Sequence, residues 1–406
     1  MKEKVLAISY FLPPYLTPQA IQIGRLLLNS QHDVIAISST DRNCILDCNL
    51  YADFSDRVFR HIKINNKYLL SGLLHKLGMK FFDFYSSYPD CYKWWIDAAY
   101  EIISREIDKE TVTKMVTFGQ PMSDHILGLK VKRKFNIPWI AHFSDPWVDN
   151  PFRHRGNDID VYNVAMERNV IEAANKLIFT SAETAKLIMQ KYPLAYSNKV
   201  HILKHSYDEM LYLENKKANN NIVVFRYIGN LYGKRSPEPL FKALNNILDE
   251  RPDLLTNVRF EFIGEISPRM VLTSAYRSLP KGLVSLKPSV NYIESLQLMK
   301  TADVLLVVDA PSENSPFFPS KLADYIGTGI FMTGVTPKGT SREILNAFKC
   351  PSADPENVKE IVEMFTRILS TKCYDSFKID IDMQKKYLVS KVAAEFDEII
   401  LDAESV

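Results

Sequence analysis

The sequence has 406 residues, of which 50 are basic and 48 acidic, and its formal net charge is +2. This balance excludes a generally polybasic protein, so the composition gives no support to nucleic-acid binding. The five cysteines are scattered without CxxC spacing, which indicates neither a disulfide framework nor a zinc site and fits the reducing cytosol.

The start of the chain predicts a cytoplasmic α/β protein. The apolar N-terminal run is too short for a signal peptide, and no window approaches the ~20 apolar residues of a membrane span. Strands are predicted in the first half over 5–10, 33–39, 114–118, 137–143, 176–180 and 200–204, with helices between them. The loop after the first strand contains Thr17, Pro18 and Gln19 and lacks GxGxxG, which argues against an NAD- or FAD-dependent oxidoreductase.

A basic segment spans 57–80, with six Lys or Arg residues, no acidic residue and leucines at helical spacing. Such a segment can rest on an anionic membrane face or admit a lipid-linked substrate. The alternative is an ordinary surface helix whose apolar side faces the core, and the sequence leaves both open.

Two candidate catalytic residues lie at the end of the strand predicted over 137–143. His142 and Asp145 fall at its C-terminal edge, where ligands bind in open α/β sheets. They can orient a hydroxyl nucleophile or support charge in a transition state. Equally, Asp145 can cap the turn before Pro146.

A polar stretch over 208–221 is the best linker candidate, and the strand–helix alternation starts again at 222–228. The next loop, from Gly229 to Pro237, combines two glycines with Lys234 and Arg235 before a helix start. This pattern is typical of an anion-binding loop, and also of a surface turn whose cations face water. Two Rossmann-like halves facing each other across a cleft are the architecture we expect.

The stretch 316–329 predicts a loop that turns into a short helix. It follows a continuous apolar strand over 302–309, which is typical of a buried parallel sheet. Ser320 is the expected N-cap, and Gly327 and Gly329 are expected to end the helix through left-handed backbone. Free first-turn amides, together with Ser320 and Lys321, favour a phosphate. Asp324 is placed to accept hydrogen bonds from sugar hydroxyls.

The chain resembles the GT-B glycosyltransferases of family 4 over nearly its whole length. The resemblance rests on the loop 229–237, on Ala302-Asp303 and on Phe318 to Gly329, with further landmarks over 13–20 and 142–147. It implies a retaining enzyme that moves a sugar from a nucleotide-sugar donor to an acceptor hydroxyl without a metal or other cofactor. The predicted domains are 1–207 on the acceptor side, 208–380 on the donor side, and a C-terminal helix over 381–406 that crosses back to the first.

The resemblance also implies roles for individual residues. Asp324 takes the place of the second glutamate of the Glu-x7-Glu motif, but Pro316 stands where the first is expected, and Glu313 replaces it only if the loop shifts. Asn230 stands where many members carry a diphosphate-binding arginine. The implied donor diphosphate ligands are Arg235, Lys234, Gly229, Asn230, Phe318, Ser320 and Lys321; the base ligands are Val290 and Tyr292; the catalytic side is Asp145 with His142; and the acceptor-side loop is Thr17, Pro18 and Gln19.

The expected partners are a nucleotide sugar and a glycan or lipid-linked acceptor, with peripheral contact to the inner face of the plasma membrane through 57–80 and no nucleic acid. Two other functions stay open on the same fold. A nucleotide-sugar 2-epimerase needs several convergent carboxylates around the sugar, of which this sequence offers fewer. A non-catalytic binding subunit is consistent with the missing first glutamate.

Overall fold

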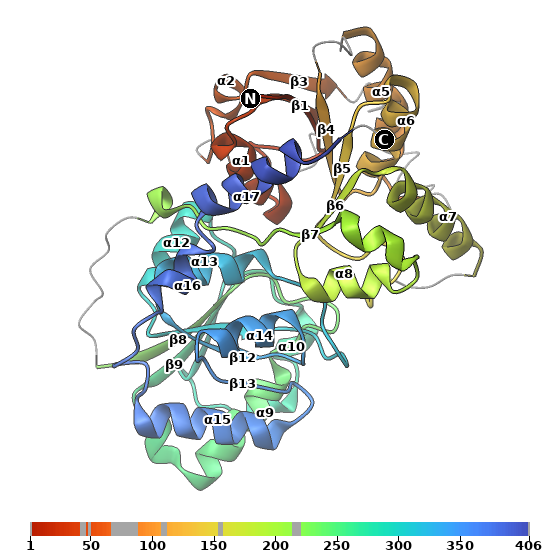
Figure 1. Ribbon diagram of the computed structural model, residues 1–406. Helices are drawn as coiled ribbons and strands as arrows, with labels where there is room; N and C mark the ends of the chain where they lie inside the picture. The colour runs from red at the N-terminus through yellow and green to blue at the C-terminus, as the bar shows by residue number, and fades with distance from the viewer. Residues whose placement is uncertain are drawn as a thin grey trace. The chain divides into compact units, whose positions relative to one another are not determined.

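A computed structural model describes residues 2–40, 46–47, 50–65, 88–106, 112–152, 157–212 and 221–404. These residues form two compact units, Met1–Lys204 with Val389–Val406, and His205–Leu388. Each unit is a parallel β-sheet covered by helices (Figure 1). In the described part of the chain, no helix is long and apolar enough to cross a membrane.

The first unit contains a sheet of seven strands in the order β3-β2-β1-β4-β5-β6-β7, counted over the described residues, and all of its pairs are parallel. The strands are β1 (Lys4–Ile8), β2 (Asp33–Thr40), β3 (Arg60–Asn65), β4 (Lys114–Phe118), β5 (Trp139–Phe143), β6 (Lys176–Phe179) and β7 (Val200–Ile202). The helices are α1 (Pro18–Asn29), α2 (Phe54–Arg57), α5 (Trp94–Glu106), α6 (Ser123–Phe135), α7 (Asn157–Ala173), α8 (Ala182–Met189), the 3₁₀ turn η1 (Leu194–Lys199) and α17 (Val389–Leu401).

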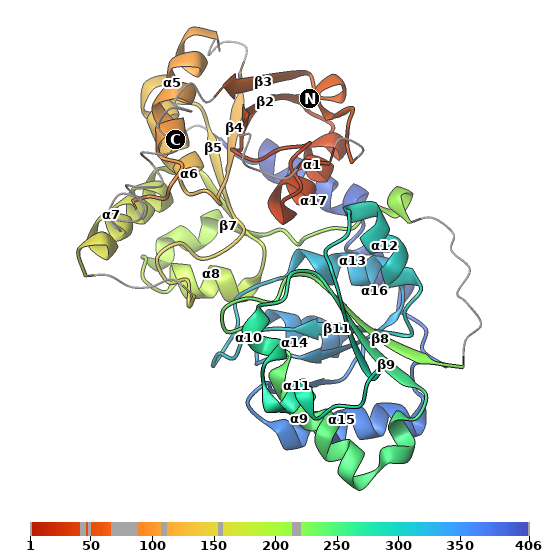
Figure 2. The same cartoon turned by 180° about the vertical axis from the view of Figure 1, so that it is seen from behind.

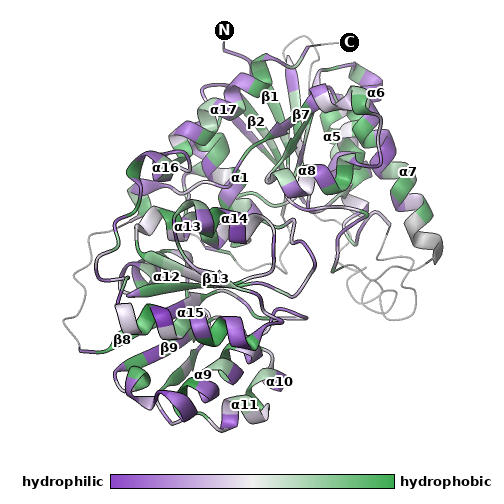
Figure 3. Ribbon diagram, turned by 60° about the horizontal axis from the view of Figure 1, so that its bottom comes forward, coloured by the Kyte–Doolittle hydropathy of each residue, from purple (hydrophilic) through white to green (hydrophobic). Residues whose placement is uncertain are grey.

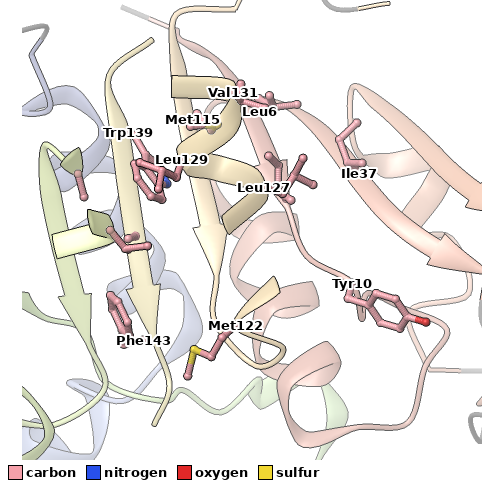
Figure 4. Close-up of a cluster of buried hydrophobic side chains, with 14 of the residues drawn as sticks. Leu6, Tyr10, Ile37, Met115, Met122, Leu127, Leu129, Val131, Trp139 and Phe143 are labelled. Atoms are coloured by element: carbon pink, nitrogen blue, oxygen red, sulfur yellow. The ribbon is translucent and has the colours of Figure 1, made fainter. Parts of the chain in front are cut away.

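The central strands β1, β4, β5 and β6 are largely apolar and buried because helices cover both faces of the sheet. One face packs against α5 and α6, and Figure 4 shows Leu127, Leu129 and Val131 of α6 beside Met115 of β4 and Trp139 of β5. On the other face, α17 lies along α1, with Phe396 fully buried next to Phe118.

The second unit contains six strands in the order β10-β9-β8-β11-β12-β13, again over the described residues and all parallel. They are β8 (Val223–Ile228), β9 (Val258–Ile263), β10 (Val284–Lys287), β11 (Val304–Val308), β12 (Phe331–Val335) and β13 (Ser352–Ala353). The helices are η2 (Glu209–Leu211), α9 (Glu238–Glu250), η3 (Pro252–Leu255), α10 (Pro268–Val271), α11 (Ser274–Arg277), α12 (Tyr292–Lys300), α13 (Ser320–Thr328), α14 (Thr340–Ala347), α15 (Val358–Thr371) and α16 (Ile381–Lys385). Figure 3 shows hydrophilic and hydrophobic residues alternating along α15, which buries Ile361, Phe365 and Ile368.

The C-terminal segment differs from the single helix predicted over 382–401. It forms two helices, α16 and α17, and the chain leaves the second unit between them at Leu388. Gln384 of α16 donates to the carbonyl of Ile326, so α16 belongs to the second unit. The fold prediction is confirmed for α17, which packs back on the first unit.

Two other predicted segments fall partly outside the described residues. Within the basic segment 57–80, residues 57–65 form the end of α2 and the strand β3 rather than a helix, and the rest lies outside the described residues. Within the linker candidate 208–221, the η2 turn is folded and Tyr212 donates to the carbonyl of Asp324, while 213–220 lies outside the described residues.

Candidate functional site

The second sheet reverses its strand order between β8 and β11. From β8 the chain moves outward to β9 and β10, and it then returns to place β11 on the other side of β8 (Figure 2). Ligands of open parallel sheets bind at the carboxyl ends of the strands at such a reversal. The loops after β8 and β11 contain most of the predicted donor-site residues.

The loop after β8 is in backbone contact with the loop after β9. A Cβ added to Gly264 would lie 2.0 Å from the carbonyl oxygen of Gly229, so only glycine fits there. Asn230 uses its side-chain oxygen to accept the backbone N–H of Glu265 at 3.0 Å. Gly229 and Asn230 therefore join two neighbouring loops at this edge of the sheet.

The two adjacent cations of this loop have different environments. Lys234 is exposed, whereas the Arg235 side chain is only 23% exposed and its Nη2 lies 3.7 Å from Oδ1 of Asp309. Burial opposes the charge of Arg235, but Tyr227 and Asp309 outweigh it and raise the pKa of the guanidinium. Arg235 is thus a permanent cation facing the end of β11.

Several buried polar atoms in the loops after β8, β11 and β12 and at the start of α14 have no hydrogen-bond partner among the described residues. Asp309 follows β11 and Thr336 follows β12, and they are neighbours because Val308 pairs with Val335. The unpartnered atoms are Oδ2 of Asp309, Oγ1 of Thr336, Oγ of Ser341 and Nε of Arg235. Buried polar groups nearly always have partners, so this set can hold the polar groups of a ligand. Burial raises the pKa of Asp309, and Arg235 and the nearby Ser341 hydroxyl oppose that rise.

Asp309, Thr336 and Ser341 are not among the site residues predicted from the sequence. The strand predicted over 302–309 counts Asp309 as its last residue. The signal was a polar side chain directly after an apolar strand, in both VLLVVD and FMTGVT.

Helix α13 begins one residue earlier than the predicted N-cap at Ser320 implies. Pro319 is the N-cap, Ser320 is the first helical residue, and no side-chain hydrogen bond caps this helix. Gly329 ends the helix with φ 72°, as predicted. Gly327 does not, because it is helical and makes room for the rings of Tyr207 and Tyr212. The Phe318 ring is buried against His205 and Tyr387.

Lys321, Asp324 and Tyr292 come together at one side of α13. The Tyr292 hydroxyl donates to Oδ1 of Asp324 at 2.6 Å, and Lys321 Nζ lies 4.0 Å from Oδ2 and 4.8 Å above the Tyr292 ring. Asp324 is buried, so its carboxylate forms part of an internal network. Val290, just before α12, is half-buried, and Glu313 is exposed in the loop after β11.

In the first unit, His142 is buried near the end of β5. Its ring lies 5.2 Å from that of Phe118, and Nδ1 has no hydrogen-bond partner among the described residues. Burial lowers the pKa of His142 to about 4. At neutral pH the imidazole is therefore uncharged, and it can donate or accept a hydrogen bond but cannot supply positive charge. Asp145, which follows this strand, is half-buried.

The predicted acceptor-side loop lies at the same edge of the first sheet. Thr17 caps α1 by accepting the N–H of Ala20 at 3.1 Å, and Pro18 opens the helix. Gln19 donates to the carbonyl of Gly119 at 2.9 Å, and Gly119 in turn donates to the carbonyl of His142 at 2.7 Å. This connects the start of α1 to the candidate catalytic strand.

Solved structures share this architecture, although no protein-family model and no curated protein matches the sequence. HepE from Anabaena, crystallised with UDP and glucose, matches with a TM-score of 0.64 at 12% identity, over 99% of this chain and 100% of that one. The lipopolysaccharide outer core galactosyltransferase WaaB matches with a TM-score of 0.60 at 14% identity, over 98% of this chain and 99% of that one. A protein from Listeria monocytogenes assigned as a UDP-N-acetylglucosamine 2-epimerase matches with 0.58 at 10% identity, over 98% and 95%.

Identities this low show the fold alone, and family 4 stays a prediction. The two parallel sheets with their flanking helices confirm two Rossmann-like domains. The chain therefore has the GT-B fold, the fold of the glycosyltransferases that its sequence resembles.

Proposed function

We propose that this protein is a glycosyltransferase that moves a sugar from a nucleotide-sugar donor to an acceptor hydroxyl, with retention and without a metal. One observation carries the proposal. At the strand-order reversal of the second unit, the permanently charged Arg235 lies 3.7 Å from the buried Asp309, and several buried polar atoms at the ends of these strands have no partner in the described part of the chain. A nucleoside diphosphate joined to a sugar supplies both an anion for the cation and hydroxyls for the polar atoms.

The proposed chemistry follows from the charge that develops on the departing nucleoside diphosphate. Without a metal, that charge must be stabilised by cations and oriented amides. Arg235 and Lys321 supply cations, and the start of α13, which no side chain caps, supplies the positive end of a helix dipole. We propose that backbone groups near Val290 and Tyr292 bind the nucleobase of the donor. We propose that Asp324 binds the ribose once its hydrogen bond with Tyr292 has opened.

We assign the catalytic side of the reaction to Asp145 and His142 of the first unit. Since His142 is neutral at pH 7, its proposed role is to hydrogen-bond the acceptor hydroxyl. The proposed role of the Asp145 carboxylate is to stabilise the positive charge that develops at the sugar carbon in the transition state. The acceptor we propose is a cell-surface glycan or a lipid-linked oligosaccharide, reached from the cytoplasmic face of a membrane. Retention is tested by comparing the anomeric configuration of donor and product by NMR.

The experiment that tests the proposal is a thermal-shift panel of nucleotide sugars and nucleoside diphosphates with a chelator present. A ligand at 100 times its Kd adds about 2.7 kcal/mol to the free energy of unfolding. We expect one nucleotide class to stabilise the wild type and to have little effect on Arg235→Ala. Lys281→Ala is the control, because it removes an exposed cation of the same unit that lies outside the predicted site and should leave the shift intact. If no nucleotide stabilises the wild type, the proposal fails.

The 2-epimerase is the second candidate, favoured by the Listeria fold neighbour. An epimerase converts its nucleotide sugar without any acceptor, whereas a transferase releases the free diphosphate only as the sugar moves to an acceptor or to water. Chromatography of the nucleotide products separates the two. A nucleotide that binds and is never converted supports the non-catalytic binding subunit.

A further inference from the structure

We propose that Glu167 is a positioning residue that fixes the segment 144–150, and with it Asp145, through a buried charged anchor. The inference rests on the proposed function for the role of Asp145. The anchor itself rests only on contacts within the first unit.

The segment 144–150 follows β5 and is held at four of its seven residues. Thr180 donates to the carbonyl of Ser144 at 2.8 Å, and the Trp147 indole donates to Asn163 at 3.0 Å. The N–H of Val148 donates to Oε2 of Glu167 at 3.0 Å, and Asp149 forms an ion pair with Lys191.

Helix α7 supplies two of these contacts from one face. Asn163 and Glu167 are four residues apart, so their side chains project from the same side of the helix. Both are fully buried. A helix face normally buries apolar side chains, so an amide and a carboxylate at these positions need specific partners, and the segment after β5 supplies them.

Glu167 is the centre of the anchor. Its Oε1 accepts from Lys191 Nζ at 2.7 Å and from the Tyr192 hydroxyl at 2.8 Å, while Oε2 is left for Val148. Burial opposes the charge of Lys191, but Glu167 and Asp149 outweigh it and raise the pKa of the ammonium. Lys191 thus joins Glu167 on α7 to Asp149 on the segment by two ion pairs.

The consequence for Asp145 follows from its place in the chain. Asp145 is next to Ser144 and two residues from Trp147, both of which are held. A catalytic group must keep its geometry within about half an ångström, and buried hydrogen-bonded supports are the means by which proteins achieve this. Removing the charge of Glu167 should therefore loosen the segment and slow the chemical step without weakening donor binding in the other unit.

The test compares Glu167→Gln with Asp397→Asn. Asp397 is a matched control because it is a buried carboxylate of the same unit that accepts a hydroxyl, from Ser30 at 2.6 Å, and a backbone N–H, from Gln31 at 2.9 Å. Three quantities are measured: kcat for donor turnover, Kd for the nucleoside diphosphate, and acrylamide quenching of Trp147 fluorescence, isolated by difference from the Trp147→Phe background.

We expect Glu167→Gln to lower kcat at least tenfold, to leave Kd within twofold, and to expose Trp147 to acrylamide, while Asp397→Asn changes none of the three. Tyr192→Phe removes one donor to Glu167 and should give a smaller effect of the same kind, which covers the case in which Glu167→Gln does not fold. Two results would overturn the proposal. One is that Glu167→Gln exposes Trp147 to acrylamide but leaves kcat unchanged; the other is that Trp147 stays shielded in both Glu167→Gln and Tyr192→Phe. If the wild type binds no nucleotide, the proposed function and the role of Asp145 are both wrong. The quenching result still decides whether Glu167 fixes the segment.

Discussion

The Arg235 guanidinium and the Asp309 carboxylate face each other at 3.7 Å across the strand-order reversal of the second sheet. This separation is too long for a hydrogen bond, so the two charges attract without being locked together. Each has another atom that is buried without a partner in the described residues, Nε on Arg235 and Oδ2 on Asp309. The carboxylate therefore partly neutralises the cation that we assign to the donor diphosphate.

Asp309→Asn should tighten the binding of a nucleoside diphosphate. The substitution removes a negative charge beside the proposed anion site, and we expect a gain of about 1 kcal/mol, roughly fivefold in Kd. Isothermal titration calorimetry at pH 7.5 measures it. Asp303→Asn is the control, because Asp303 lies at the opposite end of the same strand and accepts the N–H of Val224. Weaker binding by Asp309→Asn would instead mean that the carboxylate orients Arg235.

Asp124→Asn should remove a pH dependence of stability. Asp124 is fully buried, and burial raises its pKa well above the usual value, opposed by the N–H of Tyr10 and reinforced by Asp90. The folded state thus holds the proton more tightly than the unfolded chain. The stabilisation that protonated Asp124 contributes is complete below about pH 4. It is lost as the pH rises through the pKa of Asp124 in the folded state.

Denaturant unfolding of wild type and Asp124→Asn between pH 5 and 8 measures this difference. The asparagine keeps an acceptor for the Tyr10 N–H, which Asp124 binds at 2.8 Å, so the variant should equal or exceed the wild type at pH 8. Asp124→Leu removes that acceptor and should be less stable at every pH. Parallel pH curves for wild type and Asp124→Asn would contradict a raised pKa for Asp124.

Local patterns predicted most of the fold. The strands over 114–118 and 258–263 have the predicted bounds, because each is a short segment rich in apolar and β-branched or aromatic residues. The loop 229–237 and the start of α13 lie where the alternation of strand and helix places them. The break before α17 was missed because 382–401 has one apolar pattern, while Leu388 and Tyr387 pair with Tyr207 instead of continuing a helix.

The site was predicted less completely, because side-chain partners are set by tertiary contacts. The sequence treats Lys234 and Arg235 alike, whereas the fold exposes one and turns the other toward Asp309. No spacing rule connects Asp309 with Thr336, since they are neighbours only through the pairing of β11 and β12. Gly327 fits a helix terminus by type, but its function is to admit two tyrosine rings.

His142→Phe should weaken the acid sensitivity of the protein. Burial lowers the pKa of His142 to about 4, below the value of 6.5 expected for the unfolded chain. Between these values the unfolded chain binds a proton that the folded state does not, so stability is lost as the pH falls. By pH 5 this amounts to about 2 kcal/mol. The loss of unfolding free energy from pH 7 to 5 should be smaller in the variant by that amount, and equal losses would contradict the neutral buried imidazole.

Gly327→Ala decides between helix propensity and packing at α13. Propensity alone predicts that alanine inside a helix stabilises by up to about 1 kcal/mol. The added Cβ would lie 2.5 Å from the Tyr212 hydroxyl oxygen and 2.7 Å from the Tyr207 ring, so we expect a net loss of about 1–3 kcal/mol. Thermal unfolding gives the sign directly. Adding Tyr212→Phe removes the closest atom and should recover part of the loss. If Gly327→Ala raises Tm, residues 207–212 do not pack against α13 as the structure places them.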